Sequence, residues 1–524
     1  MNAVVLLLAA VRMAAPFTDG AVLQRDRAVP VWGSAAPGET VTVSFGGQTK
    51  RATADAEGAW RVDLDPLKAS KEGRDLVVSA CRREGAPETF AGRPRPASAA
   101  APETEKIVVR DVLVGEVWMC AGQSNTDCPI WGPRPRYRDG QGSLTISMTV
   151  KPWVRLVKVP RLPLDRPAAF TRICWKRMTP EDLAPEPHVA RPSAMGYCFA
   201  LELANALDVP IGLLDASWGG TRIEPWTPHC GFESVEGLES ERTWEFLPKE
   251  KFVNGFKVKG IGSYHQQPTA LWNGMVAPLA PMAIRGMIWY QGCSNAGAPD
   301  RYCAKMHALY NGWTKEFANP DLSLYFVQLA PYAYRPAGGD LVGLQLAQAQ
   351  FAAEEPHAAM AVIGDVGNIW DIHPNDKRTV ARRLAAHALK RDYGYDWMED
   401  ESPTLRDWRI EDGAFRLTFD HAKQLYVYNM DKSLTTGFEV CGTNGVWRPA
   451  DVQNFQVTTN RFNKPVSEGT VAGTTLVVAA KDVPEPKRLR YLHSSPWFAN
   501  LYNEASLPMG PFRIGEDAPG GAAQ

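Results

Sequence analysis

The sequence lacks three features that would assign it to common functional classes. It has almost no net charge, because 57 Lys and Arg residues face 58 Asp and Glu residues. This balance gives no basic surface for nucleic acid and no cationic face for a membrane. No apolar run approaches the roughly 18 residues that a membrane-spanning helix needs. None of the nine cysteines forms a C-x-x-C pair, so neither a zinc ribbon nor a thioredoxin-like motif is supported.

The chain is nevertheless long enough for several cores. A length of 524 residues predicts two to four domains. Residues 1–11 contain AVVLLLAA, which resembles the apolar part of a secretory signal but lacks a basic start. We interpret this stretch as a signal-peptide remnant, with a strand as the alternative. The interpretation predicts a periplasmic or secreted protein.

Residues 12–105 are expected to form an N-terminal β module. Thr40–Phe45 alternates polar and apolar residues, Gly46-Gly47 is a typical hairpin turn, and residues 48–54 return. A further short strand is expected over 60–64. Short alternating strands joined by glycine turns are typical of a small sandwich. Residues 82–105, which are rich in Ala, Pro and charge, read as a loop or linker.

Residues 106–397 change to an alternation of apolar runs and helical patterns, which indicates a parallel sheet wrapped by helices. Each apolar run ends in a polar or glycine-rich turn, and the carboxyl ends of parallel strands share one sheet edge, so these turns predict a site. The expected strands are 112–119, 209–214, 283–290, 322–329 and 358–363, and the expected helices are 194–207, 303–317, 344–353 and 377–391.

Residues 398–524 again show the pattern of short β-strands. Strands are expected at residues 415–419, 437–440, 475–478 and 488–491. We interpret this region as a second sandwich-like module.

Ser124 is the leading candidate nucleophile. It follows the first strand of the expected sheet through the small-residue turn Ala121-Gly122-Gln123, which would present a hydroxyl at the carboxyl edge. A serine at this place could instead only cap the next helix. Ser217 and Ser294 also follow strands and are rival nucleophiles of lower rank.

His373 is the best placed of the nine histidines to serve as a base, which a serine nucleophile requires. Asp371 precedes it by two residues, so a small turn could bring the carboxylate to the imidazole and stabilise its charged form. Asp-x-His could also supply two metal ligands, but no third ligand with sensible spacing is evident. An ordinary loop hydrogen bond is the remaining alternative.

Acyl transfer also needs donors directed at the developing oxyanion. Gly219-Gly220 offers backbone N–H groups without a side chain, and Asn295 offers a side-chain amide. The alternatives are a tight turn for the glycine pair and a helix cap for Asn295.

Taken together, these motifs resemble the sialate O-acetylesterase family of the SGNH hydrolase superfamily. The similarity covers nearly the whole chain in the same order. Its segments are PFTDGAVLQRDRAVPVWGSAAPGE (16–39), GEVWMCAGQSN (115–125), SWGGTRIEPWT (217–227), LWNGMVAPL (271–279), IWYQGCSNA (288–296), DIHPNDK (371–377) and NLYNEASLPMGPFR (500–513).

The resemblance implies a flavodoxin-like, doubly wound α/β hydrolase domain between the two β modules. It implies Ser124 as nucleophile, His373 as base and Asp371 as its partner. It also implies an extracytoplasmic enzyme that removes acetyl groups from sugar hydroxyls and needs neither metal nor cofactor. No nucleic-acid partner is expected, and the oligomeric state is left open. The implied oxyanion donors are the Ser124 N–H, Gly220 and Asn295, and the expected substrate contacts are Gln123, Gly219 and Gln291.

Three positions depart from the family pattern. Cys293 stands where the family usually has Glu, a residue proposed to orient the histidine in some related acetyl esterases. Thr126 replaces the usual Met, and Trp370 occupies the place of the Asp in the wider superfamily's Asp-x-x-His. Two alternative functions follow. One is an acetylxylan or other polysaccharide deacetylase on the same site, and the other is a non-catalytic carbohydrate-binding protein disabled by Cys293.

Overall fold

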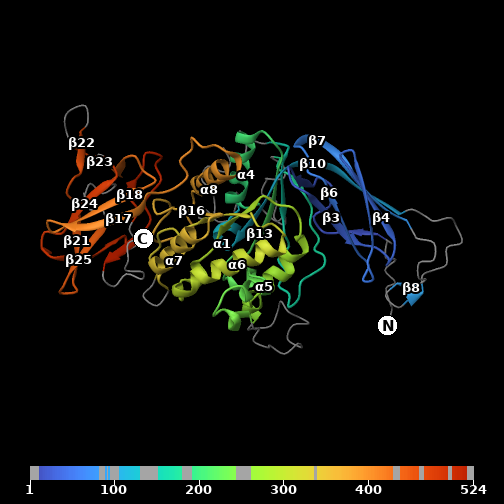
Figure 1. Cartoon of the computed structure of the whole chain (residues 1–524), viewed down its shortest axis with the longest axis horizontal. Coiled ribbons are helices and arrows are strands. Elements are labelled where there is room, and N and C mark those ends of the chain that lie inside the picture. The colour runs from blue at the N-terminus through green and yellow to red at the C-terminus, as the bar shows by residue number, and fades with distance from the viewer. Residues whose placement is uncertain are drawn as a thin grey trace.

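The computed structural model arranges the chain in three regions along its long axis (Figure 1). N-terminal strands lie at one end, an α/β region lies in the middle, and C-terminal strands lie at the other end. The expected signal remnant and most of the 82–105 loop lie outside the described residues. The structure describes residues 11–81, 89–90, 93–94, 105–129, 151–179, 192–242, 261–334, 339–428, 437–459, 465–471, 473–493 and 498–515.

The N-terminal region contains the predicted hairpin. Strands β4 (Thr40–Phe45) and β5 (Gln48–Thr53) pair antiparallel. Gly46 and Gly47 between them have φ values of 59° and 82°, which a two-residue hairpin turn requires and glycine adopts without strain. The other strands are β1 (Arg12–Met13), β2 (Val22–Gln24), β3 (Val29–Ser34), β6 (Ala59–Leu64), β7 (Ser70–Cys81), β8 (Thr89–Phe90) and β9 (Arg93–Pro94).

A single long strand joins this region to the α/β region. Strand β10 (Glu105–Gly122) pairs antiparallel with β7 and then runs parallel to two strands of the central sheet, β13 (Ile211–Ser217) and β14 (Gly286–Tyr290). Residues 112–122 are all buried, as expected for a strand that is covered on both faces. The prediction for 112–119 therefore located the strand but missed its length.

The central sheet has the strand order β12-β11-β13-β10-β14-β15-β16. Six of these strands run parallel, namely β11, β13, β10, β14, β15 and β16, and β12 is an antiparallel edge strand. The five predicted strands are all present, whereas β11 and β12 were not predicted. Their bounds are β11 (Val154–Lys158), β12 (Lys176–Arg177), β15 (Ser323–Val327) and β16 (Ala358–Ala361), in addition to β10, β13 and β14.

Helices cover both faces of this sheet. Helices α4 (Ala194–Leu207) and α8 (Lys377–Tyr393) pack together, as do α6 (Tyr302–Glu316) and α7 (Leu341–Glu354), and the two pairs lie on opposite sides (Figure 1). All four were predicted. Shorter helical turns are α1 (Ser124–Asp127), η2 (Glu224–Trp226), α5 (His229–Glu233), η3 (Glu239–Arg242), η5 (Ile261–Gln266), η6 (Trp272–Val276), η7 (Ala277–Leu279), η8 (Cys293–Asn295) and η9 (Pro299–Arg301).

The C-terminal region has a hydrophobic core of its own, distinct from the core shared by the first two regions. Its strands form a seven-stranded and a four-stranded sheet, and the four predicted strands are confirmed as β18, β20, β24 and β25. The strand bounds are β17 (Thr404–Glu411), β18 (Ala414–Asp420), β19 (Leu425–Tyr428), β20 (Phe438–Gly442), β21 (Trp447–Val452), β22 (Gln456–Thr459), β23 (Pro465–Val471), β24 (Thr475–Ala479), β25 (Pro486–Tyr491), β26 (Leu501–Tyr502) and β27 (Phe512–Gly515).

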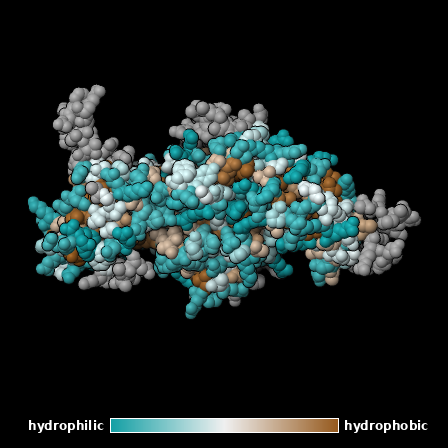
Figure 2. All heavy atoms as spheres, turned by 45° about the horizontal axis from the view of Figure 1, so that its top comes forward, coloured by the Kyte–Doolittle hydropathy of each residue, from teal (hydrophilic) through white to brown (hydrophobic). Residues whose placement is uncertain are grey.

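The surface is mostly hydrophilic. Figure 2 shows hydrophobic residues as separate small patches on the face in view, which is ordinary for a folded protein surface. In the part of the chain that the structure describes, no helix combines the length and apolarity that crossing a membrane requires. Cys120 and Cys128, which lie beside the Ser124 turn, are not joined in a disulfide.

Candidate active site

Ser124 lies where the longest strand of the central sheet ends. Strand β10 stops at Gly122, and Ser124 is the first residue of α1. Gly122 has a φ of 139°, and a Cβ at this residue would lie 2.4 Å from the carbonyl oxygen of Tyr290. Only glycine allows this close approach of two strands. The capping position of α1 belongs to Gln123, so Ser124 does not cap the helix.

The hydroxyl of Ser124 instead contacts His373. Its Oγ lies 2.9 Å from His373 Nε2, although 249 positions separate the two residues in the sequence. His373 lies in the loop between β16 and α8. A serine hydroxyl within hydrogen-bond distance of an imidazole is the arrangement that activates a nucleophile.

Asp371 shapes the histidine loop from two residues away. Its Oδ1 accepts a hydrogen bond from the backbone N–H of His373 at 3.0 Å and lies 3.5 Å from His373 Nδ1. The first contact is the local turn that an Asp two residues upstream can form. The second places a carboxylate on the side of the imidazole opposite Ser124. In the described residues, no third metal-ligating side chain joins this pair.

Two residues that sequence reasoning did not single out anchor this loop. Asn125 donates from Nδ2 to the carbonyl of Ile372 at 3.0 Å. The ammonium of Lys377, a fully buried residue, donates to Asn125 Oδ1 at 2.5 Å. Both residues lie inside the quoted motifs, directly after Ser124 and at the end of DIHPNDK. Their positions within these motifs could have identified them from the sequence.

Gly219, the first residue of the glycine pair, lies against Ser124. A Cβ on Gly219 would lie 3.4 Å from Ser124 Cβ, so the turn after β13 contacts the Ser124 turn directly. Gly220 has a φ of 78°, and a Cβ there would meet nothing within 4 Å. A side chain at residue 220 would therefore point into open space, and the positive φ is what favours glycine there.

Asn295 is held by a buried ion pair. Its Nδ2 donates to Glu224 Oε1 and Oε2 at 3.2 and 3.0 Å, and its Oδ1 accepts from the Ile223 N–H at 3.0 Å. Lys305 Nζ lies 2.7 Å from Glu224 Oε1. Burial alone would raise the pKa of Glu224, but Lys305 and the Asn295 amide hold that pKa below its usual value. Glu224 is therefore a charged anchor that fixes the orientation of the Asn295 amide.

Gln123 and Gln291 are buried and bind protein groups. Gln123 Oε1 accepts from the backbone N–H groups of Gly292 and Ser294 at 3.2 and 3.3 Å. Gln291 donates to Asn295 Oδ1 at 2.7 Å and accepts from the Tyr302 hydroxyl at 2.7 Å. Both amides therefore hold the 291–295 turn in place, and their contact with substrate stays a prediction.

Ser217, one of the two rival serines, differs from Ser124 in its surroundings. Ser217 is fully buried, and its hydroxyl bonds to Asp215 at 2.6 Å and to Lys158 at 2.7 Å. Lys158 also bonds to Asp127 at 3.0 Å, and Arg161 contacts the same carboxylate. This network lies next to α1 and occupies the Ser217 hydroxyl. Ser294, the other rival, is only partly buried.

Cys293 does not supply the charge of the Glu that it replaces. Burial raises the pKa of its thiol to about 11, so the thiol is neutral at physiological pH. The nearby charge of Lys377 opposes this rise without cancelling it. The Tyr334 hydroxyl lies 3.5 Å from the Cys293 carbonyl. Trp370, at the other departure from the superfamily pattern, is 78% exposed.

Comparisons with known proteins find carbohydrate acetylesterases. A family model described as carbohydrate esterase, sialic acid-specific acetylesterase, matches residues 175–362. This stretch includes Gly220 and Asn295. The sialate O-acetylesterase of Mus musculus is 28% identical over 509 residues and is matched over 88% of each chain. The Homo sapiens enzyme is 26% identical over 491 residues, covering 88% of this chain and 86% of its own.

A solved structure extends the similarity to the fold. The crystal structure of a carbohydrate acetylesterase from Xanthomonas citri superimposes with a TM-score of 0.75 at 29% identity. The match covers 97% of this chain and 100% of that chain. It therefore includes all three regions described above. By these matches, the chain is similar in sequence and in structure to sialate O-acetylesterases and to other carbohydrate acetylesterases.

Proposed function

We propose that this protein is a serine esterase that removes O-acetyl groups from sugar hydroxyls through an acetyl-serine intermediate. The observation that carries the proposal is the 2.9 Å contact between Ser124 Oγ and His373 Nε2. The names of the relatives, which are sialate and carbohydrate acetylesterases, support an acetylated sugar as the substrate.

In the first half of the reaction, His373 Nε2 accepts the proton of Ser124 as Oγ attacks the acetyl carbonyl carbon. The carbonyl oxygen becomes an oxyanion, and the proposed donors to it are the Ser124 N–H, the Gly220 N–H and the Asn295 amide. The first N–H groups of a helix have no partner inside that helix, which suits Ser124 to this task. A single donor of this kind contributes on the order of 100-fold or more in rate.

The tetrahedral intermediate then collapses. The bond between the acetyl carbon and the sugar oxygen breaks, and that oxygen takes the proton from His373, so the sugar leaves as an alcohol. Water repeats the sequence with His373 again as base, which releases acetate and restores the Ser124 hydroxyl. Asp371 stabilises the imidazolium that forms in each half.

The fold supports the same proposal. Without β11 and β12, the parallel strands have the order β13-β10-β14-β15-β16, which is the 2-1-3-4-5 order of flavodoxin-like sheets. We propose an SGNH-type hydrolase domain at 106–397, flanked by sandwich-like modules at 12–105 and 398–524. Ser124 follows the central strand at the point where the order reverses, where such sheets bind ligands. A periplasmic or secreted location is proposed from residues 3–10 alone.

The test is hydrolysis of 4-nitrophenyl acetate by the wild type, Ser124→Ala and Ser294→Ala. We expect activity to fall to background in Ser124→Ala and to persist in Ser294→Ala, the serine of the neighbouring turn. Turnover like that of the wild type in a folded Ser124→Ala protein would contradict the mechanism.

A third variant, Cys293→Glu, tests the pseudoenzyme alternative. We expect an active wild type, because the serine and histidine are in contact without a carboxylate at 293. A silent wild type rescued by Cys293→Glu would instead indicate a disabled, carbohydrate-binding protein. An active wild type should next be assayed on O-acetylated sialic acid and acetylated xylan, which separates the sialate interpretation from polysaccharide deacetylation.

A further inference from the structure

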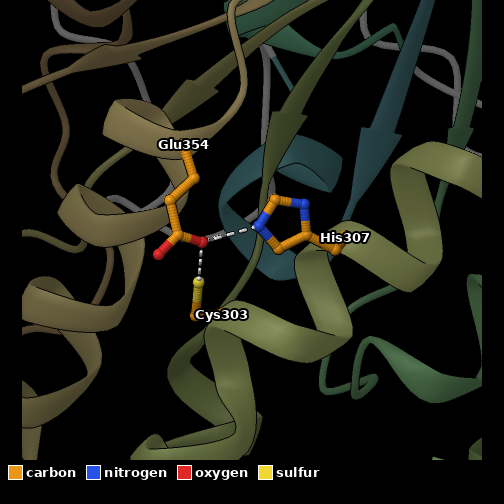
Figure 3. Close-up of side chains that lie close together, drawn as sticks. All are labelled: Cys303, His307 and Glu354. Carbon is orange, nitrogen blue, oxygen red and sulfur yellow. Dashed lines mark hydrogen bonds and ion pairs between the residues drawn. The ribbon is translucent and has the colours of Figure 1, made fainter. Parts of the chain in front are cut away.

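A second cluster of reactive side chains lies between α6 and α7. Figure 3 shows the carboxylate of Glu354, at the end of α7, directed at both Cys303 and His307 of α6. Glu354 Oε2 lies 3.4 Å from Cys303 Sγ and 2.9 Å from His307 Nε2. The three ligand atoms all lie within 4.8 Å of one another. No step of the proposed esterase reaction uses these residues.

The spacing on α6 separates this cluster from the esterase site. Cys303 and His307 are four residues apart, so they lie on one face of the helix. Lys305 is rotated by about 200° from Cys303 at 3.6 residues per turn, and it bonds to Glu224 beside Asn295. One face of helix α6 therefore contacts Glu224, the residue that anchors Asn295, and the other face carries Cys303 and His307.

The two distances from the Glu354 oxygen to its partners are close to those around a tetrahedral zinc ion. Zinc binds Cys sulfur at about 2.3 Å and His nitrogen or carboxylate oxygen at about 2.0–2.2 Å, so its ligand atoms lie roughly 3.3–3.6 Å apart. The observed 3.4 Å between sulfur and oxygen fits this range, and the 2.9 Å between nitrogen and oxygen needs only a small expansion. Thiolate, imidazole and carboxylate together are ligands that zinc accepts.

Neighbouring side chains already orient two of these ligands. Gln350 Nε2 donates to Glu354 Oε1 at 2.9 Å, which leaves Oε2 directed at the cluster. The Phe351 ring packs edge-on against His307, with centroids 4.8 Å apart and an interplanar angle of 70°. Such outer contacts fix ligand geometry in metal sites. The side chains of His307 and Glu354 are 25% and 46% exposed, which leaves a path for an ion and a water ligand.

We propose that Cys303, His307 and Glu354 bind one zinc ion that links α6 to α7, with water as the fourth ligand. Binding replaces the thiol proton of Cys303 with the metal and releases that proton to solvent. The site would stabilise the packing of the two helices without entering the esterase reaction. The competing interpretation is a set of ordinary hydrogen bonds between two helices.

The test uses purified, tag-free full-length protein and zinc or cobalt as the probe. We expect about one zinc per chain after equilibrium dialysis, and a thiolate-to-cobalt charge-transfer band after cobalt addition. Cys303→Ser and His307→Gln should each weaken zinc binding by at least about 100-fold, since the loss of an outer partner alone weakens it about 10- to 100-fold. Gln350→Ala should cause that smaller loss.

Cys230→Ser is the matched control. Cys230 Sγ lies 3.4 Å from Glu316 Oε1, the same distance as in the cluster, but no third ligand completes a group there in the described part of the chain. We expect its zinc content and cobalt band to equal those of the wild type. Absence of bound zinc in the wild type, or a band that survives Cys303→Ser, would overturn the proposal. Zinc content and the cobalt band do not depend on esterase activity, so either proposal can fail alone.

Discussion

Asn125 Nδ2 donates a hydrogen bond to the carbonyl of Ile372 at 3.0 Å. The residue after the proposed nucleophile thus holds the residue before the proposed base. Lys377 reinforces this link through Asn125 Oδ1. The contact between Ser124 and His373 therefore depends on a neighbouring pair of residues that takes no part in the chemistry.

Asn125→Ala tests this positioning role. Without the amide, the loop that carries His373 loses its anchor to α1, and a displacement of about 1 Å can reduce turnover about 100-fold. We expect kcat for 4-nitrophenyl acetate to fall about 10- to 100-fold with little change in KM. Asn375→Ala, an exposed position in the same loop, should leave kcat unchanged. Equal activity in both variants would show that other contacts hold the loop.

Asp371→Asn tests the partner of the base. The amide can still accept from the His373 N–H, but it cannot stabilise an imidazolium. Loss of an orienting carboxylate can reduce turnover about 10⁴-fold. Because Oδ1 lies 3.5 Å from Nδ1, we expect a smaller loss of about 100- to 1,000-fold in kcat. Asp376→Asn is the control, since Asn caps α8 as well as Asp does. Wild-type kcat in Asp371→Asn would remove Asp371 from the mechanism.

Gly219→Ala and Gly220→Ala should differ in effect. The new methyl at 219 would lie 3.4 Å from Ser124 Cβ, at the near limit of ordinary van der Waals contact, and would fill space beside the nucleophile, so we expect kcat to fall about 10-fold. At 220 the methyl meets nothing within 4 Å, but the φ of 78° is unfavourable for alanine. We expect Gly220→Ala to reduce the free energy of unfolding by about 1–2 kcal/mol. Urea denaturation and steady-state kinetics separate the two effects.

The stability of the protein should depend on Asp400 in a pH-dependent way. Burial alone would raise the pKa of Asp400, but His387, Lys390 and Arg391 hold it well below its usual range. The stabilisation is therefore complete above the unfolded-state pKa of about 4 and is lost as pH falls through the lower, folded-state pKa.

Asp400→Asn should thus reduce the free energy of unfolding by about 1.5–3 kcal/mol at pH 7, because the partly exposed cations Lys390 and Arg391 lose their hydrogen-bonded carboxylate. The difference from the wild type should shrink below about pH 4. Urea denaturation at several pH values measures it. Asp396→Asn, an exposed position nearby, should change stability by less than about 0.5 kcal/mol. A pH-independent difference would contradict the assignment.

Local pattern was enough to predict most elements of the α/β region. The five strands and four long helices could be predicted because continuous apolar runs and helical periodicity indicate directly which residues are buried. Strand β11 was missed since its five residues include Arg155 and Lys158. Both cations become buried only because distant carboxylates pair with them: Asp111 with Arg155, and Asp127 and Asp215 with Lys158.

The sequence by itself determined that Ser124 ends a buried strand and that Asp371 and His373 share a turn, because these are relations between near neighbours. Only the tertiary structure decided that Ser124 meets His373, that Asn295 is tied to Glu224 and Lys305, and that Gln123 and Gln291 are buried supports. Side chains far apart in the sequence meet only after the sheet has assembled, and no local periodicity encodes which of them will bond.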